Sequence, residues 1–385
     1  MKSIGVLLLS ATALLAGTSV SAQKITASPS ADYTLFVTEL QSGLQSPWGM
    51  AFLPDRRMLI TQKTGQLLIV SADGKRTLAT LGNLPAVASQ GQGGLLDVAL
   101  DPDFAQNKFV YWSYAESGTG REKGLSGTAV ARGRLQGDSL QSIQVIYRQT
   151  PKVKGNGHFG SRLVFGKDKT LFITLGDRQK FTPAQDMAQS IGKVVRIQRD
   201  GSLPKDNPKW LHPRALPEIY SLGHRNPQGA ALHPLSGALW VSEHGPQGGD
   251  EINRVQAGKN YGWPLASYGC NYGEPVGEEC RLGGGKHAPK YIEPLSTWVP
   301  TSVAPSNFIF YSGPAFPKWQ GQVLMGALAG TALWRVQYAG EKEVKRERLL
   351  ADLGERIRNV EQGPDGFVYL LTDSGKLLKI SPLPR

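Results

Sequence analysis

Four clusters of polar residues lie at the ends of apolar, strand-like segments, where side chains can reach a ligand. They are Gly91–Gly94, Gly223–Gly229, His244–Glu251 and Arg356–Arg358. Arg356 and Arg358 are two residues apart in an extended segment, so both side chains point to one face. Two adjacent guanidinium groups repel unless an anion lies between them, and their planar forks suit carboxylates or phosphates. The pair therefore predicts an anionic ligand, with a solvated basic edge as the alternative.

The third cluster has the composition of a cation site. It runs through three glycines and ends in the adjacent carboxylates of Asp250 and Glu251. Calcium is bound by carboxylates and backbone carbonyls, and glycines let the backbone approach an ion closely. The segment indicates a calcium site, although Asp and Gly are also common in ordinary turns.

His158 is the candidate general base, because it alone among the six histidines sits in a Gly-flanked loop just ahead of a repeated strand. A structural histidine is the alternative. The surrounding segment 155–160 matches G-x-G-x-x-G, but a strand follows it where a dinucleotide site needs a helix. We therefore exclude a nicotinamide site here.

Other common chemistries find no local support. The sequence has no H-E-x-x-H, C-x-x-C or G-x-S-x-G motif, which argues against zinc hydrolysis and a serine nucleophile. The formal charge is +12, but there is no arginine-rich run and no recognisable nucleic-acid motif. We expect an anionic small ligand and no nucleic acid.

A repeated hairpin must position these residues. Each copy is an apolar strand, a turn carrying Pro, Asp or Gly, and a second apolar strand. The copies are 48–61, 96–113, 162–175, 229–242, a degenerate 307–327, and 360–372. Repeats of this kind predict an all-β protein, a six-bladed β-propeller in which each hairpin is part of a four-stranded blade. A β-sandwich is the alternative.

Tyr33–Leu40 is an alternating strand ahead of the first copy, and we expect it to complete the last blade and close the ring. Long insertions are expected around residues 115–160, 178–222 and 243–300. In a propeller, such loops rise from one face and build a site near the central channel.

The N-terminus predicts export. Residues 1–22 combine a basic start, a short apolar run and small residues before Gln23, as in a cleaved signal peptide. The mature chain, 23–385, is then one propeller domain in the periplasm or secreted, with no membrane span. Cys270 and Cys280 are the only cysteines, and an oxidising compartment favours a disulfide between them.

The clusters together resemble, in order and spacing, the soluble glucose and aldose sugar dehydrogenases that depend on pyrroloquinoline quinone (PQQ). The motifs that carry the resemblance are Gly-Gln-Gly-Gly-Leu-Leu from 91, His-x-x-x-Arg-Leu from 158, Gly-x-Arg-Asn from 223, His-Gly-Pro-x-x-x-Asp-Glu-Ile-Asn from 244, Asn-Tyr-Gly-Trp-Pro from 260, Val-Ala-Pro-Ser from 303 and Arg-x-Arg from 356. The family's fold is a six-bladed propeller with PQQ on its top face.

The resemblance assigns a role to each site residue. It implies His158 as the base and Arg225 as stabiliser of charge on the quinone, with PQQ and Ca²⁺ as cofactors. The residues implied to bind PQQ are Gln92, Arg225, Asn226, Ser302, Arg356 and Arg358. Those implied to bind calcium are Gly245 and Pro246 at PQQ, and Glu251 and Tyr261 at a second, structural ion.

The implied reaction is oxidation of an aldose at C1 to a lactone, followed by electron transfer to an unidentified acceptor, in a monomer or dimer. Two positions depart from the glucose dehydrogenases: Gly157 replaces an acid before the histidine, and Leu328-Ala329 replaces a lysine near the cofactor. Two alternatives remain, a calcium-dependent propeller hydrolase resembling a lactonase and a propeller that only binds glycans or proteins.

Overall fold

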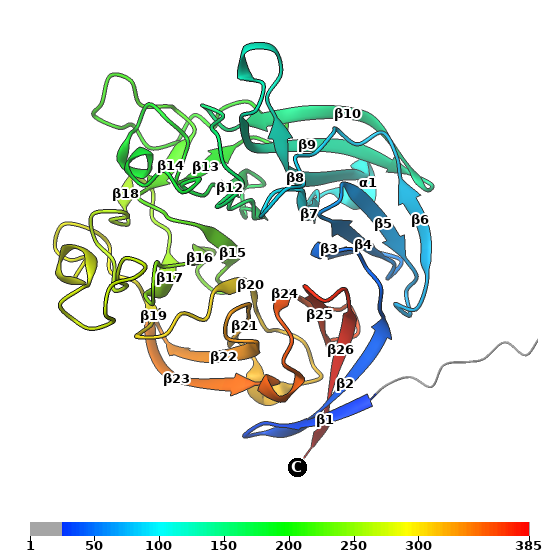
Figure 1. The fold of residues 1–385 in the computed structure, drawn as a ribbon. Coiled ribbons are helices and arrows are strands. Elements are labelled where there is room, and N and C mark those ends of the chain that lie inside the picture. The colour runs from blue at the N-terminus through cyan, green and yellow to red at the C-terminus, as the bar shows by residue number, and fades with distance from the viewer. Residues whose placement is uncertain (1–24, 385) are drawn as a thin grey trace, which may run out of the picture.

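The computed structural model describes residues 25–384, so the predicted signal peptide lies outside the described residues. Six sheets, antiparallel except for the short pair between β14 (Ile219–Leu222) and β18 (Lys259–Asn260), stand around a central axis as the blades of a propeller (Figure 1). This confirms the predicted fold class. The strands nearest the axis are β3 (Pro47–Phe52), β7 (Leu95–Leu100), β11 (Leu163–Phe165), β15 (Pro227–Leu232), β20 (Pro305–Phe310) and β24 (Ile357–Gln362).

Each predicted hairpin forms the inner strand of a blade and the strand beside it. These second strands are β4 (Met58–Gln62), β8 (Phe109–Ser117), β12 (Leu171–Thr174), β16 (Leu239–Glu243), β21 (Val323–Ala327) and β25 (Val368–Thr372). These strands are buried along nearly their whole length, as fits strands that are covered by a neighbouring blade on each face.

The outer strands and helices complete the blades. The outer strands are β5 (Gln66–Val70), β6 (Thr77–Leu81), β9 (Ser126–Gln136), β10 (Ser139–Arg148), β13 (Lys193–Ile197), β14 (Ile219–Leu222), β17 (Asp250–Arg254), β18 (Lys259–Asn260), β19 (Ser296–Trp298), β22 (Ala332–Ala339), β23 (Lys342–Leu349) and β26 (Leu377–Pro384). One short α-helix, α1 (Phe104–Asn107), and the 3₁₀ turns η1 (Gly120–Glu122), η2 (Thr182–Gln185), η3 (Leu282–Gly284), η4 (Pro317–Trp319) and η5 (Ala351–Leu353) lie in the connections. No helix in residues 25–384 is long and apolar enough to cross a membrane.

The two ends of the chain close the ring in one blade. Strand β2 (Tyr33–Gln41) pairs with β26, and β1 (Ile25–Pro29) pairs with β2 at the outer edge. Along β2, Tyr33, Leu35 and Val37 are buried while the residues between them are partly exposed. The prediction that 33–40 completes the last blade is confirmed.

One predicted insertion is in good part regular structure. The long outer strands β9 and β10 take up 21 of the 46 residues of 115–160, and the longer irregular parts are 118–125 and 149–162. Polar side chains on the exposed face of β10 hide its alternation in the sequence. The other two segments do carry long loops, at 175–192, 198–218 and 261–295. Within the last, Cys270 and Cys280 form the predicted disulfide.

Leu35→Ala tests the closure of the ring. Leu35 is fully buried in the core between β2, β24 and the segment around Trp319, so the change should lower the free energy of unfolding by about 2–5 kcal/mol. Urea denaturation measures it, with Leu78→Ala in β6, where the side chain is 46% exposed, as control. Equal effects in the two variants would contradict a stabilising role for β2.

Candidate active site at one end of the channel

The predicted site residues reach one face because of the fold. Each blade repeats the same antiparallel meander, so every inner strand begins at the same end of the channel (Figure 1). Gln92, His158, Arg225 and Ser302 lie in the loops that enter β7, β11, β15 and β20. Residues up to 210 positions apart in the chain are thereby brought together.

A cavity of about 640 Å³ opens at this face, which is within the size range of small-molecule sites. Of the predicted residues, those that line it are Gln92, His158, Arg225, Gly245 and Ser302. Those that do not line it are Asn226, Pro246, Glu251, Tyr261, Arg356 and Arg358. Ala329 also lines the cavity, so the family's lysine is replaced there by a methyl group.

His158 is held on the cavity wall by its backbone and by one ring nitrogen. Its backbone is left-handed, with φ of 49°, and its N–H donates to Oε1 of Gln92 at 2.8 Å. Its Nδ1 lies 2.6 Å from Oδ1 of Asp177. Burial lowers the pKa of His158, and Arg225 lowers it further, against the opposing effect of Asp177. The imidazole is therefore neutral at neutral pH, with Nδ1–H donated to Asp177 and Nε2 available as an acceptor.

Asp177 is a site residue that sequence reasoning missed. It is fully buried, and its Oδ2 accepts a 2.7 Å hydrogen bond from Nε1 of Trp263, while Oδ1 also accepts the N–H of Gln179. The signal that could have found it is its place just beyond strand 171–174, on the face where the inner strands begin. It supplies the acid expected beside the histidine.

The space beside Gly157 is taken by the side chain of Gln179. A Cβ built there would lie 2.6 Å from the side-chain amide of Gln179. Gln179 therefore occupies the room that an acid at 157 would need, and it also lines the cavity.

Arg225 and Asn226 present incompletely bonded polar groups. Nη1 of Arg225 donates to the carbonyl of His244 at 3.3 Å, its guanidinium lies 5.1 Å over the Trp263 ring, and its Nε is buried without a partner in the described residues. Asn226 accepts the N–H of Gly160 at 3.1 Å, and its Nδ2 is likewise buried without a partner there. Unsatisfied buried donors of this kind fit a bound polar ligand.

A buried carboxylate fixes the loop that carries Gly245 and Pro246. Oδ1 of Asp250 accepts the N–H of Gly245 at 2.8 Å, and Oδ2 accepts the N–H groups of Val303 and Ala304 at 2.6 and 2.7 Å. Burial raises the pKa of Asp250 to about 6, against the lowering effect of these hydrogen bonds.

Ser302 ties the same two loops together from the other side. Its hydroxyl donates to the carbonyl of Pro246 at 3.1 Å and accepts the N–H of Gly248 at 2.9 Å. The loop from 245 to 250 is thus held to the loop before β20 by side chains on both, which fixes the direction of its carbonyl groups.

The arginine pair has its anion within the protein. Arg356 and Arg358 do point to one side, where both bond to Asp373: Nε of Arg356 lies 2.9 Å from Oδ2, and Nε of Arg358 lies 2.8 Å from Oδ1. Arg358 also donates to Oε1 of Gln228. The carboxylate of Asp373 therefore largely neutralises the repulsion from which an external anion was predicted. The prediction did not include Asp373 because it lies in the β25–β26 connection, away from the arginine pair in the sequence.

Glu251 and Tyr261 line a second, much smaller cavity of about 20 Å³ behind the first. Asn253 donates to both Glu243 and Glu251 at 3.0 Å, so the two buried carboxylates are close. Burial, together with the negative charge of Glu243, raises the pKa of Glu251 well above its usual value. The hydroxyl of Tyr261 is bonded to Arg254 and Gln256, which leaves its carbonyl for any ligand.

Comparison with known proteins shows the family of this chain. Residues 44–379 match the family model described as glucose/sorbosone dehydrogenase. The chain belongs to this family. It is 45% identical over 354 residues to aldose sugar dehydrogenase YliI of Escherichia coli, covering 91% of this chain and 93% of that protein.

Two solved structures are similar to this member of the glucose/sorbosone dehydrogenase family. The apo-form of the soluble aldose sugar dehydrogenase from Escherichia coli has 44% identity and a TM-score of 0.84, covering 91% of this chain and 100% of that one. The PQQ-bound form of the aldose sugar dehydrogenase from Streptomyces coelicolor has 27% identity and a TM-score of 0.73, covering 90% and 98%.

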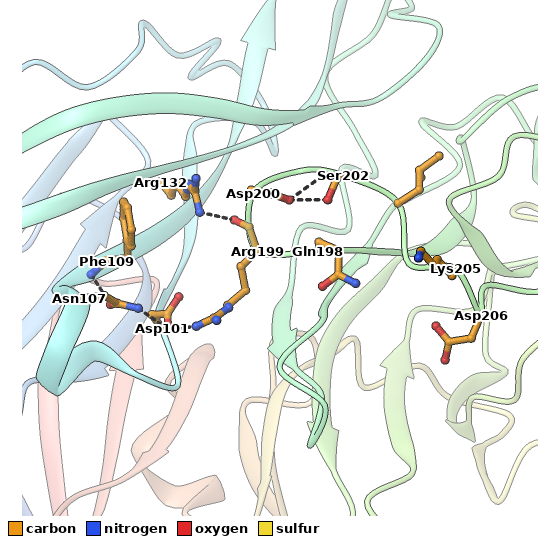
Figure 2. A pocket seen from close by; sticks show the side chains of 11 residues that line it. Asp101, Asn107, Phe109, Arg132, Gln198, Arg199, Asp200, Ser202, Lys205 and Asp206 are labelled. Atoms are coloured by element: carbon orange, nitrogen blue, oxygen red, sulfur yellow. Dashed lines mark hydrogen bonds and ion pairs between the residues drawn. The ribbon is translucent and has the colours of Figure 1, made fainter.

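A larger cavity in this family member, about 780 Å³, lies at the opposite face, where β7 and β13 end (Figure 2). Both of its arginines are bonded within the protein: Arg199 pairs with Asp101 at 2.8 Å, and Arg132 donates to the carbonyl of Arg199 at 2.8 Å. None of the predicted site residues lines it. The size of a cavity alone therefore does not identify the site, since five of the predicted site residues line the smaller one.

Asp250→Asn tests whether this carboxylate fixes the loops. An amide would turn its NH₂ toward at least one backbone N–H, so we expect a loss of about 1–3 kcal/mol in the free energy of unfolding. Asp200→Asn is the control, because Asp200 is exposed and accepts only from Ser202. Urea denaturation of both variants decides, and an Asp250→Asn protein as stable as the control would contradict the role.

Proposed function

We propose that the protein oxidises aldose sugars at C1 to lactones, with PQQ and calcium as cofactors and His158 as general base. The observation that carries the proposal is the buried His158–Asp177 pair on the wall of a 640 Å³ cavity. Membership of the glucose/sorbosone dehydrogenase family and the relatives named aldose sugar dehydrogenases support the substrate class.

His158 would take the proton of the anomeric hydroxyl at Nε2. Its lowered pKa keeps the imidazole neutral and ready to accept. Asp177 holds the tautomer through Nδ1 and would stabilise the imidazolium once the proton has moved. Trp263 fixes Asp177 in turn, since its indole N–H occupies the second carboxylate oxygen.

Arg225 would face the negative charge that develops in the cavity. It stands on the cavity wall, and its position over Trp263 and its bond to His244 fix the guanidinium before a ligand arrives. A cation held in place beforehand stabilises developing charge without reorganisation.

The residues fit PQQ in part through their unsatisfied groups. Bound PQQ would accept the hydride from C1, and calcium would polarise its quinone oxygens. Arg225 and Asn226 offer buried donors without partners, whereas Arg356 and Arg358 would share any carboxylate of the cofactor with Asp373. Gln92 and Ser302 line the cavity and would complete the contacts.

Calcium would be held by backbone carbonyls and by one buried carboxylate. Gly245 and Pro246 would donate carbonyl oxygens beside PQQ, from a loop that Asp250 and Ser302 already fix. Glu251 and the carbonyl of Tyr261 would hold the second ion. Support for the second site comes from the raised pKa of Glu251, beside the carboxylate of Glu243, and from Oδ1 of Asn253, an oxygen that is buried without a partner in the described residues.

The arginine pair does not distinguish a dehydrogenase from a hydrolase or from a binding-only propeller. Asp373 supplies an anion to Arg356 and Arg358 whichever of these functions the protein has. The His158–Asp177 pair favours an enzyme over a binding module. The disulfide supports the proposed periplasmic or secreted location. The electron acceptor and the choice between monomer and dimer remain predictions to be tested by experiment.

Removal of cofactor and metal tests the proposal. Dye-linked oxidation of glucose should require both PQQ and calcium, should stop after EDTA treatment, and should return when calcium and PQQ are added together. Protein given either one alone is the control. Full activity without both would contradict the proposal, and metal-dependent lactone hydrolysis without PQQ would favour the hydrolase.

A further inference from the structure

We infer that Tyr272 is a platform on which a second sugar ring stacks when the substrate is a neutral oligosaccharide. The inference rests on the proposed function and extends it to the substrate class. Tyr272 belongs to the disulfide loop, residues 270–280, which was not among the predicted site residues.

The disulfide loop forms the outer wall of the cavity. Tyr272 and Val276 line the same cavity as His158, yet the tyrosine is 72% exposed and the histidine only 6%. His158 therefore stands deep in the cavity and Tyr272 at its mouth. A sugar with C1 at His158 would extend its next unit toward the mouth.

Tyr272 is the sole Phe, Tyr or Trp among the described residues that line this cavity. The inner wall is polar, with His158, Arg225 and Gln92. A pyranose is amphipathic, with hydroxyls at its rim and C–H groups on its faces, and an aromatic ring offers the complementary apolar surface. The polar floor and aromatic mouth suit a chain of at least two sugar units.

The loop is rigid enough to hold the ring in place before binding. The disulfide closes it, and Cys270 exchanges two backbone hydrogen bonds with Gln247, at 2.9 and 3.0 Å. The N–H of Gly273 also donates to Oε1 of Gln247. An aromatic side chain on a fixed loop loses little conformational entropy when a ligand covers it.

The charge of the loop selects among sugars. Glu274, Glu278 and Glu279 are exposed on it, and Arg281 pairs with Glu278 alone. An acidic second unit would be repelled, so the platform favours neutral sugars.

The test compares kcat/KM for glucose with those for maltose and cellobiose in the reconstituted enzyme. Tyr272→Ala should lower kcat/KM for at least one disaccharide about threefold to tenfold, through KM, and leave glucose unchanged. Tyr272→Phe should keep the parent's values because it keeps the ring. Leu235→Ala, an 87% exposed side chain in the β15–β16 turn at the opposite face, is the matched control.

Saturation-transfer NMR gives a readout that does not depend on oxidation. Methyl β-cellobioside and methyl β-maltoside lack the reactive hydroxyl, and their outer rings should receive saturation from the parent and Tyr272→Phe but not from Tyr272→Ala. The inference is overturned if the parent oxidises glucose but neither disaccharide, if Tyr272→Ala changes all sugars equally or none, or if Tyr272→Phe behaves as Tyr272→Ala. A parent that fails to oxidise glucose contradicts the proposed function instead.

Discussion

Closure of the ring is the constraint on which the rest of the structure depends. Once β2 pairs with β26, each blade is packed between two neighbours, and the repeated meander, which starts every inner strand at the same end of the channel, is closed into a ring. His158, Arg225 and Ser302 come from three different loops, and only this closed arrangement places them on one cavity. The relative positions of these three residues therefore depend on the whole ring.

Three buried or half-buried carboxylates then fix the site locally. Asp177 orients the imidazole of His158, Asp250 holds the Gly245 loop through backbone N–H groups, and Asp373 joins the two arginines. Asp177 and Asp373 lie in the connections that follow β12 and β25, whereas Asp250 is the first residue of β17. In every case a charge is positioned by the protein before any ligand binds, which is the condition for electrostatic stabilisation without reorganisation.

The sequence was sufficient for the blades, because apolar strands and the turns between them are local signals. It predicted closure by 33–40, and five of the predicted site residues, His158 and Arg225 among them, line one cavity. It did not reveal Asp177 or Asp373, because each lies 15 to 19 residues along the chain from the side chains it holds, and only the fold brings them into contact. It overestimated the insertion at 115–160, because β10 is an edge strand whose exposed polar face conceals its period.

The central claim is that Asp177 holds His158 in its neutral form, ready to act as the base. The most direct test measures the rate at which glucose reduces bound PQQ in a single turnover, as a function of pH. The parent's rate should fall at acid pH through an ionisation below the usual histidine value, because burial lowers the pKa of His158. His158→Gln should bind PQQ, slow the step by about 10² or more and lose this pH dependence. Asp177→Asn should also slow the step and move the fall to lower pH, because Asp177 raises that pKa. A His158→Gln protein that reduces PQQ at the parent's rate and with the parent's pH profile would contradict the account.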